Sequence, residues 1–213
     1  MNFISSSPIL ILLYAWAILY ILMGVHFHSL SKIQKRLFPL LGLLLCILNY
    51  LLRQQLGPAA YGKLILLTMH LPTFLVFRYI TKTSIIKTAF MILTALVFTA
   101  PVILLGNLVR QIFFVGSSKA LLLANLVSFG IMLLLAYFVF RQGFQYLLKY
   151  GDNRFFLLFS IVPLLYYLYV LAIVNFDFSA LHSLRGYIVR FIPTLEVFAM
   201  YFLLPQIYRS LSE

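Results

Sequence analysis

The sequence has 213 residues, of which 64% are hydrophobic and only 9% are charged. A soluble domain carries roughly 25% charged residues, so this chain has too few charges to solvate its surface, and its mean hydropathy of +1.06 favours a lipid bilayer as the solvent. Its 16 lysines and arginines outnumber 4 acidic residues, giving a net charge of +12, but they stand singly or in small groups between apolar runs, which is typical of membrane topology signals and argues against nucleic-acid binding.

Seven apolar segments are long enough, or nearly long enough, to cross a bilayer, which takes about 20 residues. They are residues 8–25, 37–52, 64–79, 88–108, 120–140, 155–175 and 187–208. The second is short, and His70 and Pro72 interrupt the third, so either could be a tilted or re-entrant segment. Gly57-Pro58 between them signals a turn. We predict an all-α fold: a single polytopic transmembrane bundle of about seven helices over residues 1–213.

The distribution of basic residues predicts the orientation of the bundle. Basic residues concentrate on the cytoplasmic side of membrane proteins. With seven spans and an outer N-terminus, ten of the sixteen basic residues fall inside. These are Lys32, Lys35, Arg36, Arg78, Lys82, Lys87, Arg141, Lys149, Arg154 and Arg209. The C-terminus is then cytoplasmic, whereas six spans would put both ends on one side.

Residues 141–150 mix basic and aromatic side chains and allow two interpretations. They could form an amphipathic helix lying at the inner membrane interface. They could equally continue the fifth span, with Arg141 and Lys149 reaching out toward the lipid headgroups.

The sequence offers little for catalysis. It has no H-E-x-x-H, G-x-S-x-G or Walker A motif, and four acidic residues leave little for a paired-carboxylate mechanism. Cys46 stands alone in an apolar setting, which excludes an intramolecular disulfide and argues against a cysteine nucleophile. His26 and His28 are two residues apart, so a helix would place them on different faces. We therefore expect no catalytic residue, metal site or cofactor in this chain.

Two polar residues within the predicted spans stand out. Glu196 lies inside the last span, where a carboxylate costs on the order of 3 kcal/mol, so we expect it to face the bundle interior and pair, or to stay protonated. Its role is either a ligand contact or a structural hydrogen bond. His70 lies two residues before Pro72, and the simpler interpretation is a helix kink at which a nearby polar group satisfies a freed backbone carbonyl.

Three stretches carry a family resemblance. They are Tyr61-Gly-Lys followed by MHLPTFLVFRY at residues 69–79, Leu93-Thr-Ala with Pro101 and Leu105-Gly106, and VPLLYY at residues 162–167 followed by Phe191-Ile-Pro and Tyr201. They resemble blocks in the membrane sensor domains of bacterial histidine kinases that carry a GHKL-type ATPase domain. The best-known relatives of these kinases sense peptide pheromones. The resemblance runs from about residue 61 to the end of the sequence.

The resemblance implies that a cytoplasmic helix with a phosphoacceptor histidine, and then the ATPase domain, follow such a sensor domain. Neither is in this chain, so we expect the output kinase domain to be absent from it. The full-length parent would be an ATP-dependent protein histidine kinase, and a response regulator would be its partner only through that absent domain.

We therefore expect a signal-input domain in the plasma membrane, acting as a homodimer, whose last helix relays an extracellular signal such as a peptide. The residues expected near the ligand are Glu196, Arg185 and Arg190, with Tyr166 and His70 as contacts inside the bundle. The alternative function is a small membrane transporter or transporter subunit, because broken helices and midplane ionisable groups are typical of transporters. A membrane peptidase is a third hypothesis, which the missing nucleophile–base pair disfavours.

Overall fold

The fold is described here from a computed structural model, which covers residues 7–23, 30–113, 118–175 and 184–212. Within these ranges the chain forms helices and short connections, and no strand. The helices are α1 (Ser7–Leu22), α3 (Lys32–Ile65), α4 (Leu71–Thr81), α5 (Ile85–Phe113), α6 (Ser118–Leu135), α7 (Arg141–Tyr150), α8 (Asn153–Asn175) and α9 (Leu184–Ser212). Two π-helical turns, η2 (Leu66–His70) and η3 (Ala136–Phe140), join α3 to α4 and α6 to α7.

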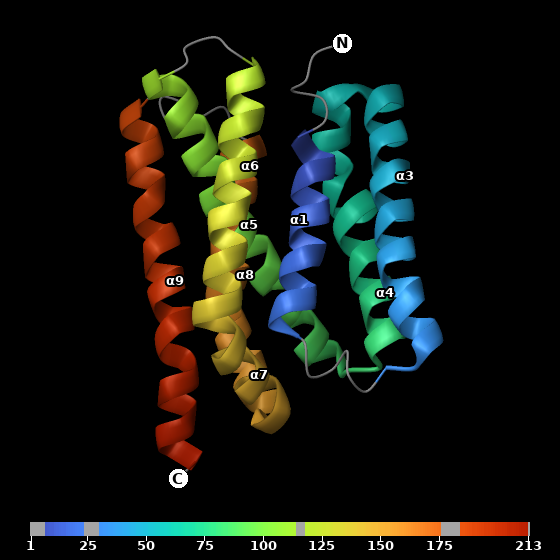
Figure 1. The fold of residues 1–213 in the computed structure, drawn as a ribbon, viewed down its shortest axis with the longest axis vertical. Coiled ribbons are helices and arrows are strands. Elements are labelled where there is room, and N and C mark those ends of the chain that lie inside the picture. The colour runs from blue at the N-terminus through green and yellow to red at the C-terminus, as the bar shows by residue number, and fades with distance from the viewer. Residues whose placement is uncertain (1–6, 24–29, 114–117, 176–183, 213) are drawn as a thin grey trace.

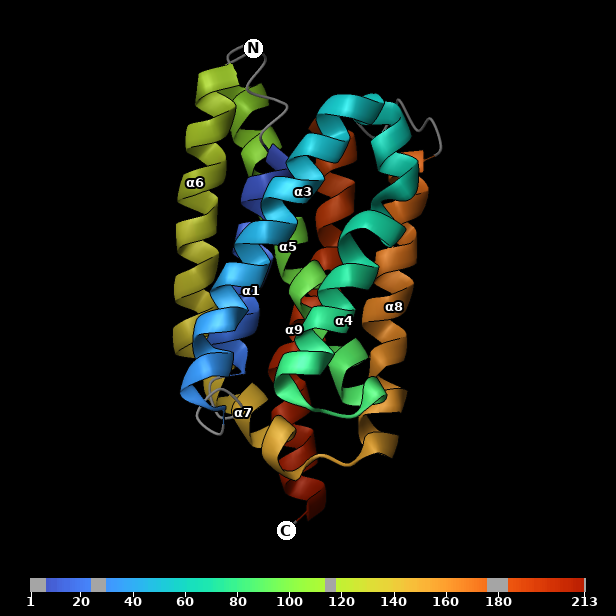
Figure 2. The same cartoon turned by 90° about the vertical axis from the view of Figure 1, so that its right-hand side faces the viewer.

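The chain runs up and down the long axis of the bundle. α1 begins at the upper end in Figure 1, and α9 ends at the lower end. Ser31 starts α3 with a capping box, in which its hydroxyl accepts from the Gln34 backbone N–H and its own N–H donates to the Gln34 side chain. α3 rises to Gly57, whose φ of 78° breaks the helical conformation. The chain reverses there and descends through η2 and α4 (Figure 2), so the turn predicted at Gly57-Pro58 is confirmed.

Six helical stretches in the described residues are long and apolar enough to cross a membrane. They are Lys32–Gly57, Ala60–Thr81, Ile85–Gly106, Leu122–Tyr150, Asn153–Val170 and Val189–Ser210. Leu10–Leu22 is a shorter apolar helix. The prediction of an all-helical membrane bundle is confirmed at this level. The second and third predicted spans both lie in helical stretches of this length.

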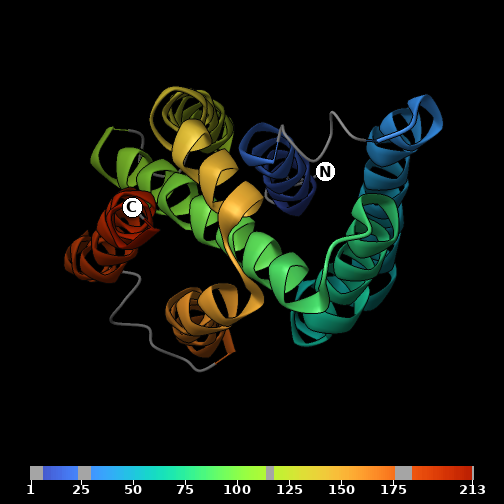
Figure 3. The same ribbon diagram turned by 90° about the horizontal axis from the view of Figure 1, so that it is seen from below.

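α5 is the helix around which the others pack. It crosses the middle of the bundle when seen along the long axis (Figure 3), and α1, α4, α6, α8 and α9 all contact it. Phe90, Phe98 and Val102 on α5 are fully buried. The Phe98 ring meets Phe140 edge-on at 5.2 Å and Phe198 at 4.7 Å, measured between ring centroids. The aromatic side chains of three helices thus pack around one position of α5.

Hydroxyl groups tie the outer helices to α5. The Thr94 hydroxyl donates to the Phe90 carbonyl at 2.7 Å, so the Tyr201 hydroxyl of α9 donates to Thr94 Oγ1 at 2.9 Å. The Tyr14 hydroxyl of α1 donates to the Phe98 carbonyl at 3.2 Å. Such bonds hold helices together where lipid provides no hydrophobic drive between them.

Residues 141–150 continue the fifth predicted span. The helix runs without interruption from Leu122 to Tyr150, and η3 changes its direction (Figure 3). Phe144, Leu147 and Leu148 on α7 are buried, and α7 contacts α1 and α9. The apolar face of this segment therefore packs on protein, and its position relative to the membrane interface stays a prediction. The histidines at positions 26 and 28 lie outside the described residues.

The contact between α1 and α3 is close at Gly42. A Cβ atom at this position would lie 2.9 Å from two ring carbons of Trp16, which is buried. Phe38, one turn before Gly42 on α3, packs against the same indole ring, with ring centroids 4.4 Å apart. The absence of a side chain at Gly42 is what lets the indole ring lie against the α3 backbone.

We predict that Gly42→Ala destabilises the protein by about 1–3 kcal/mol, because the added methyl group overpacks the Trp16 ring. Thermal unfolding of the detergent-solubilised protein measures this. Gly130→Ala is the matched control, since a Cβ at Gly130 meets nothing within 4 Å. It should stabilise α6 by ~0.5–1 kcal/mol through helix propensity. Equal effects of the two substitutions would contradict the close contact.

Candidate functional site

A cavity of about 220 Å³ lies between the descending arm of α3, η2, α5 and α8. It lies in the half of the bundle where α1 begins, because Ile11 belongs to the first turns of α1 and Gly62 follows soon after the reversal at Gly57. α8 runs beside α3 and α4 here (Figure 2). The lining residues are Ile11, Gly62, Ile65, Met69, His70, Leu96, Val97, Thr99, Ala100, Ile103, Tyr166, Tyr167 and Val170.

The wall is mainly apolar, with a few polar groups placed on it. The His70 ring meets the Tyr167 ring edge-on, with centroids 5.3 Å apart and an interplanar angle of 86°. The Tyr167 hydroxyl is buried and has no hydrogen-bond partner among the described residues. The Thr99 hydroxyl donates a hydrogen bond to the Leu96 carbonyl at 2.6 Å. An apolar pocket with a small number of polar groups is the usual form of a small-ligand site.

The π-helical turn η2 places His70 on this wall. Pro72 has no backbone N–H, and the chain accommodates it by a wider turn in which the Leu71 N–H donates to the Leu66 carbonyl. Two threonines bond back to the backbone here: the Thr68 hydroxyl donates to the Leu64 carbonyl at 3.1 Å, and the Thr73 hydroxyl donates to the Met69 carbonyl at 2.6 Å. The predicted break at Pro72 is therefore present as a π-turn, and the His70 ring contacts Tyr167.

One wall of the cavity is linked to the last helix through Tyr166. Its ring lines the cavity, and its hydroxyl lies 2.6 Å from Thr194 Oγ1 on α9. Thr194 donates its own proton to the Arg190 carbonyl at 3.0 Å, so Tyr166 is the donor to Thr194. Both side chains are buried. A hydroxyl chain thus connects the cavity wall to the backbone of α9.

The structure brings together two of the five predicted site residues and separates the others. His70 and Tyr166 line the same cavity. Arg190 is half-buried on α9, and its Nε donates to the Gly186 carbonyl at 3.4 Å. The backbone of Arg185 belongs to α9, and its side chain lies outside the described ones.

Glu196 lies on the outer face of α9. Its side chain is exposed on the surface of α9, as are those of its neighbour Leu195 and of Ile192. The expectation that Glu196 faces the bundle interior is therefore wrong. The interior positions of this turn belong to Thr194 and Val197, which are buried. Nothing in the local sequence distinguishes the two faces, because apolar residues surround Glu196 on both sides.

Sequence reasoning missed Thr194, Tyr167 and Thr99 as parts of this region. A threonine four residues after a carbonyl in a helix can bond back to it, and that local signal was present for Thr194. The contact between Tyr166 and Thr194 joins positions 28 residues apart, and only the packing of α8 on α9 creates it.

Comparisons with known proteins identify no relative: no family model matches the chain, and neither a curated protein nor a solved structure is significantly similar to it. The site must therefore be interpreted from its own geometry. That geometry suits binding of a small apolar group, oriented by the polar atoms of His70, Tyr166 and Tyr167.

We predict that Ala100→Leu is neutral or stabilising, because its side chain extends into the cavity, whereas Ala95→Leu on the same helix destabilises by about 1–3 kcal/mol. Both alanines are buried, at 8% and 2% exposed, and only Ala100 lines this cavity. Thermal unfolding of the two variants makes the comparison. Equal destabilisation would show that the space beside Ala100 is already filled.

Proposed function

We propose that this chain is the membrane-embedded signal-input domain of a two-component sensor histidine kinase. A ligand from outside the cell would bind the cavity between η2, α5 and α8, and α9 would carry the change to a cytoplasmic kinase. The chain itself would supply no catalysis. The ATP-dependent reaction and the response regulator would belong to the full-length parent, as the resemblance of residues 69–79 and 162–167 implies.

The observation that carries this proposal is the hydrogen bond from Tyr166 to Thr194. It joins the cavity wall directly to the last helix, at 2.6 Å and out of contact with water. A second bond, from Tyr201 to Thr94, joins the same helix to α5 closer to its lower end. A ligand that displaces Tyr166 would therefore bias the position of α9 against the rest of the bundle. Such a bias between two packings is what signal transmission requires.

The dimensions of the cavity favour one side chain of a peptide as the bound group. At about 220 Å³ it is smaller than the ~300–1,000 Å³ typical of pockets for drug-sized ligands. An aliphatic or aromatic side chain would fill it. A polar atom at the edge of that side chain would give the Tyr167 hydroxyl a hydrogen-bond partner. The rest of such a ligand would stay outside the bundle, near the start of α9.

The distribution of charge supports a cytoplasmic position for the C-terminal end of α9. Nine of the ten basic residues assigned inside lie where α3, α5 and α8 begin or where α4, α7 and α9 end, and the tenth, Arg141, begins α7. These are ends at the lower side of Figure 1, on the side of the C-terminus. Positive charge on the cytoplasmic side is the rule for membrane proteins. The cavity, in the opposite half, would then be open to ligands from outside.

The exposed Glu196 supports a homodimer built on α9. It lies in the middle of a helix long and apolar enough to span the membrane, and a carboxylate facing lipid there costs on the order of 3 kcal/mol. A second copy of α9 would remove that cost by hydrogen bonding. The same helix would then carry both the dimer contact and the link to the cavity.

We predict that Tyr166→Phe raises the ligand concentration needed for half-maximal output by about three- to thirtyfold, as expected for loss of ~0.6–2 kcal/mol of interhelical hydrogen bonding. The measurement uses a chimera of this chain with a reporter kinase, titrated with candidate peptides in membrane vesicles.

Tyr14→Phe is the matched control for this experiment. It also removes a buried interhelical hydrogen bond, from α1 to the Phe98 carbonyl, without touching α9. Its titration curve should match that of the wild type. If the wild-type chimera gives constant output with every candidate ligand, the sensor proposal is overturned. Solute flux through proteoliposomes of the purified chain would favour the small transporter instead.

We predict that Glu196→Ala weakens dimerisation by about three- to thirtyfold in lipid vesicles, because it removes a polar contact between helices. Energy transfer between labelled copies at several protein-to-lipid ratios measures the dimer fraction. Leu195→Ala, at an exposed neighbouring position, is the control and should have a smaller effect. An unchanged dimer fraction in the Glu196 variant would contradict the α9 dimer.

A further inference from the structure

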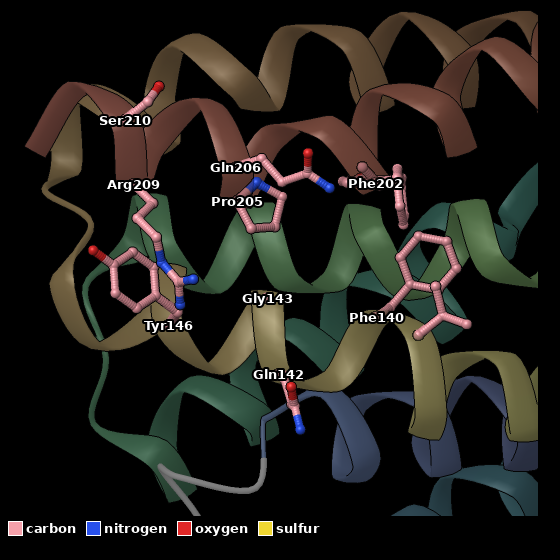
Figure 4. Close-up of a pocket in the computed structure, with 11 residues that line it drawn as sticks. Phe140, Gln142, Gly143, Tyr146, Phe202, Pro205, Gln206, Arg209 and Ser210 are labelled. Carbon is pink, nitrogen blue, oxygen red and sulfur yellow. The ribbon is translucent and has the colours of Figure 1, made fainter.

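A second pocket, of about 370 Å³, lies between α7 and α9 near the end of α9 (Figure 4). The two helices approach each other closely at its centre. A Cβ atom on Gly143 would lie 2.6 Å from Cγ of Pro205, so the absence of a side chain at Gly143 permits this approach. Beyond this point the helices leave room between their side chains, and the pocket is open toward the outside of the bundle.

The pocket has a polar end and an apolar end. Arg209, Ser210 and Tyr146 lie together at one end, toward the C-terminus of α9 (Figure 4). Phe140 and Phe202 lie at the other end, deeper in the span. Gln206 lies between them. A gradient of this kind along a membrane-facing groove matches a molecule with a polar head and an apolar tail.

The charge of the polar end is positive. The Arg209 guanidinium carbon lies 4.9 Å from the centroid of the Tyr146 ring, which holds the cation over the ring face. Gln206 adds a neutral amide donor to the pocket, whereas the Ser210 hydroxyl donates to the Ile207 carbonyl at 2.9 Å. Among the described residues that line the pocket, none is acidic. An arginine with an amide donor on the same helix is a suitable set for a phosphate group.

We propose that this pocket binds an anionic phospholipid of the inner leaflet. The phosphate of the headgroup contacts Arg209 and Gln206, and an acyl chain lies along Phe140 and Phe202. A free phosphate or sugar phosphate shares the headgroup chemistry but leaves the apolar end uncovered, which is why the lipid is the favoured occupant. Basic pockets between helices at the cytoplasmic side are a recurrent form of anionic-lipid site.

Native mass spectrometry of the delipidated chain tests this site directly, without any signalling readout. The protein is titrated with phosphatidylglycerol, with phosphatidylcholine and with soluble glycerol 3-phosphate. We expect tight binding of phosphatidylglycerol and not of the other two ligands. The Arg209→Gln variant should bind phosphatidylglycerol about fivefold more weakly, which is the effect of one basic residue at a membrane surface. Arg154→Gln removes an equal charge at the start of α8, outside the pocket, and should bind as the wild type does.

A second variant tests the apolar end. Phe202 is exposed, so Phe202→Ser does not disturb the core. It should abolish the preference for long-chain over short-chain phosphatidylglycerol. Three results would overturn the proposal: equal losses in the Arg209 and Arg154 variants, which indicate diffuse charge attraction; equal binding of phosphatidylcholine; or displacement of the lipid by equimolar glycerol 3-phosphate, which indicates a site for soluble anions.

Discussion

The need to pair every backbone polar group inside a bilayer governs this structure. Lipid offers no hydrogen bonds, so the spanning segments must be helices, and every interruption of a helix must be compensated within the protein. The chain shows this at Pro72, where a π-turn accommodates the missing N–H. A second interruption lies at Gly57, where the helical conformation breaks in the polar region between two spans. The outline of the bundle follows from these compensations.

The same shortage of partners gives side-chain hydroxyls their importance. A threonine hydroxyl that donates to its own helix can still accept a hydrogen bond. Thr94 and Thr194 each accept one from the hydroxyl of a tyrosine on another helix. Both pairs involve α9, and one of them also forms a cavity wall. The last helix is therefore held by a few directional bonds in an otherwise apolar interface.

The two pockets differ in chemistry because they lie at different depths. The cavity beside Tyr166 is mainly apolar and lies within the bundle, where the buried Tyr167 hydroxyl has no hydrogen-bond partner among the described residues. The pocket beside Arg209 lies at the end of a helix, where a cation can remain hydrated or meet a headgroup. The cavity is linked to α9 through the hydrogen bond from Tyr166 to Thr194, and Pro205 and Arg209 of α9 line the pocket directly. Occupancy of either one would act on the same helix from opposite ends.

The sequence by itself determined the helical class, the membrane environment, the turn at Gly57 and the break near Pro72, because each depends on local composition or backbone chemistry. Only the tertiary structure decided which polar residues meet: Tyr166 and His70 share a cavity, whereas Glu196 is exposed. The reason is that lipid is as apolar as the bundle interior, so a spanning helix carries apolar residues on all sides and has no periodic pattern that marks its inner face. The packing of α9 against α5 and α8 turned Thr194 inward and Glu196 outward.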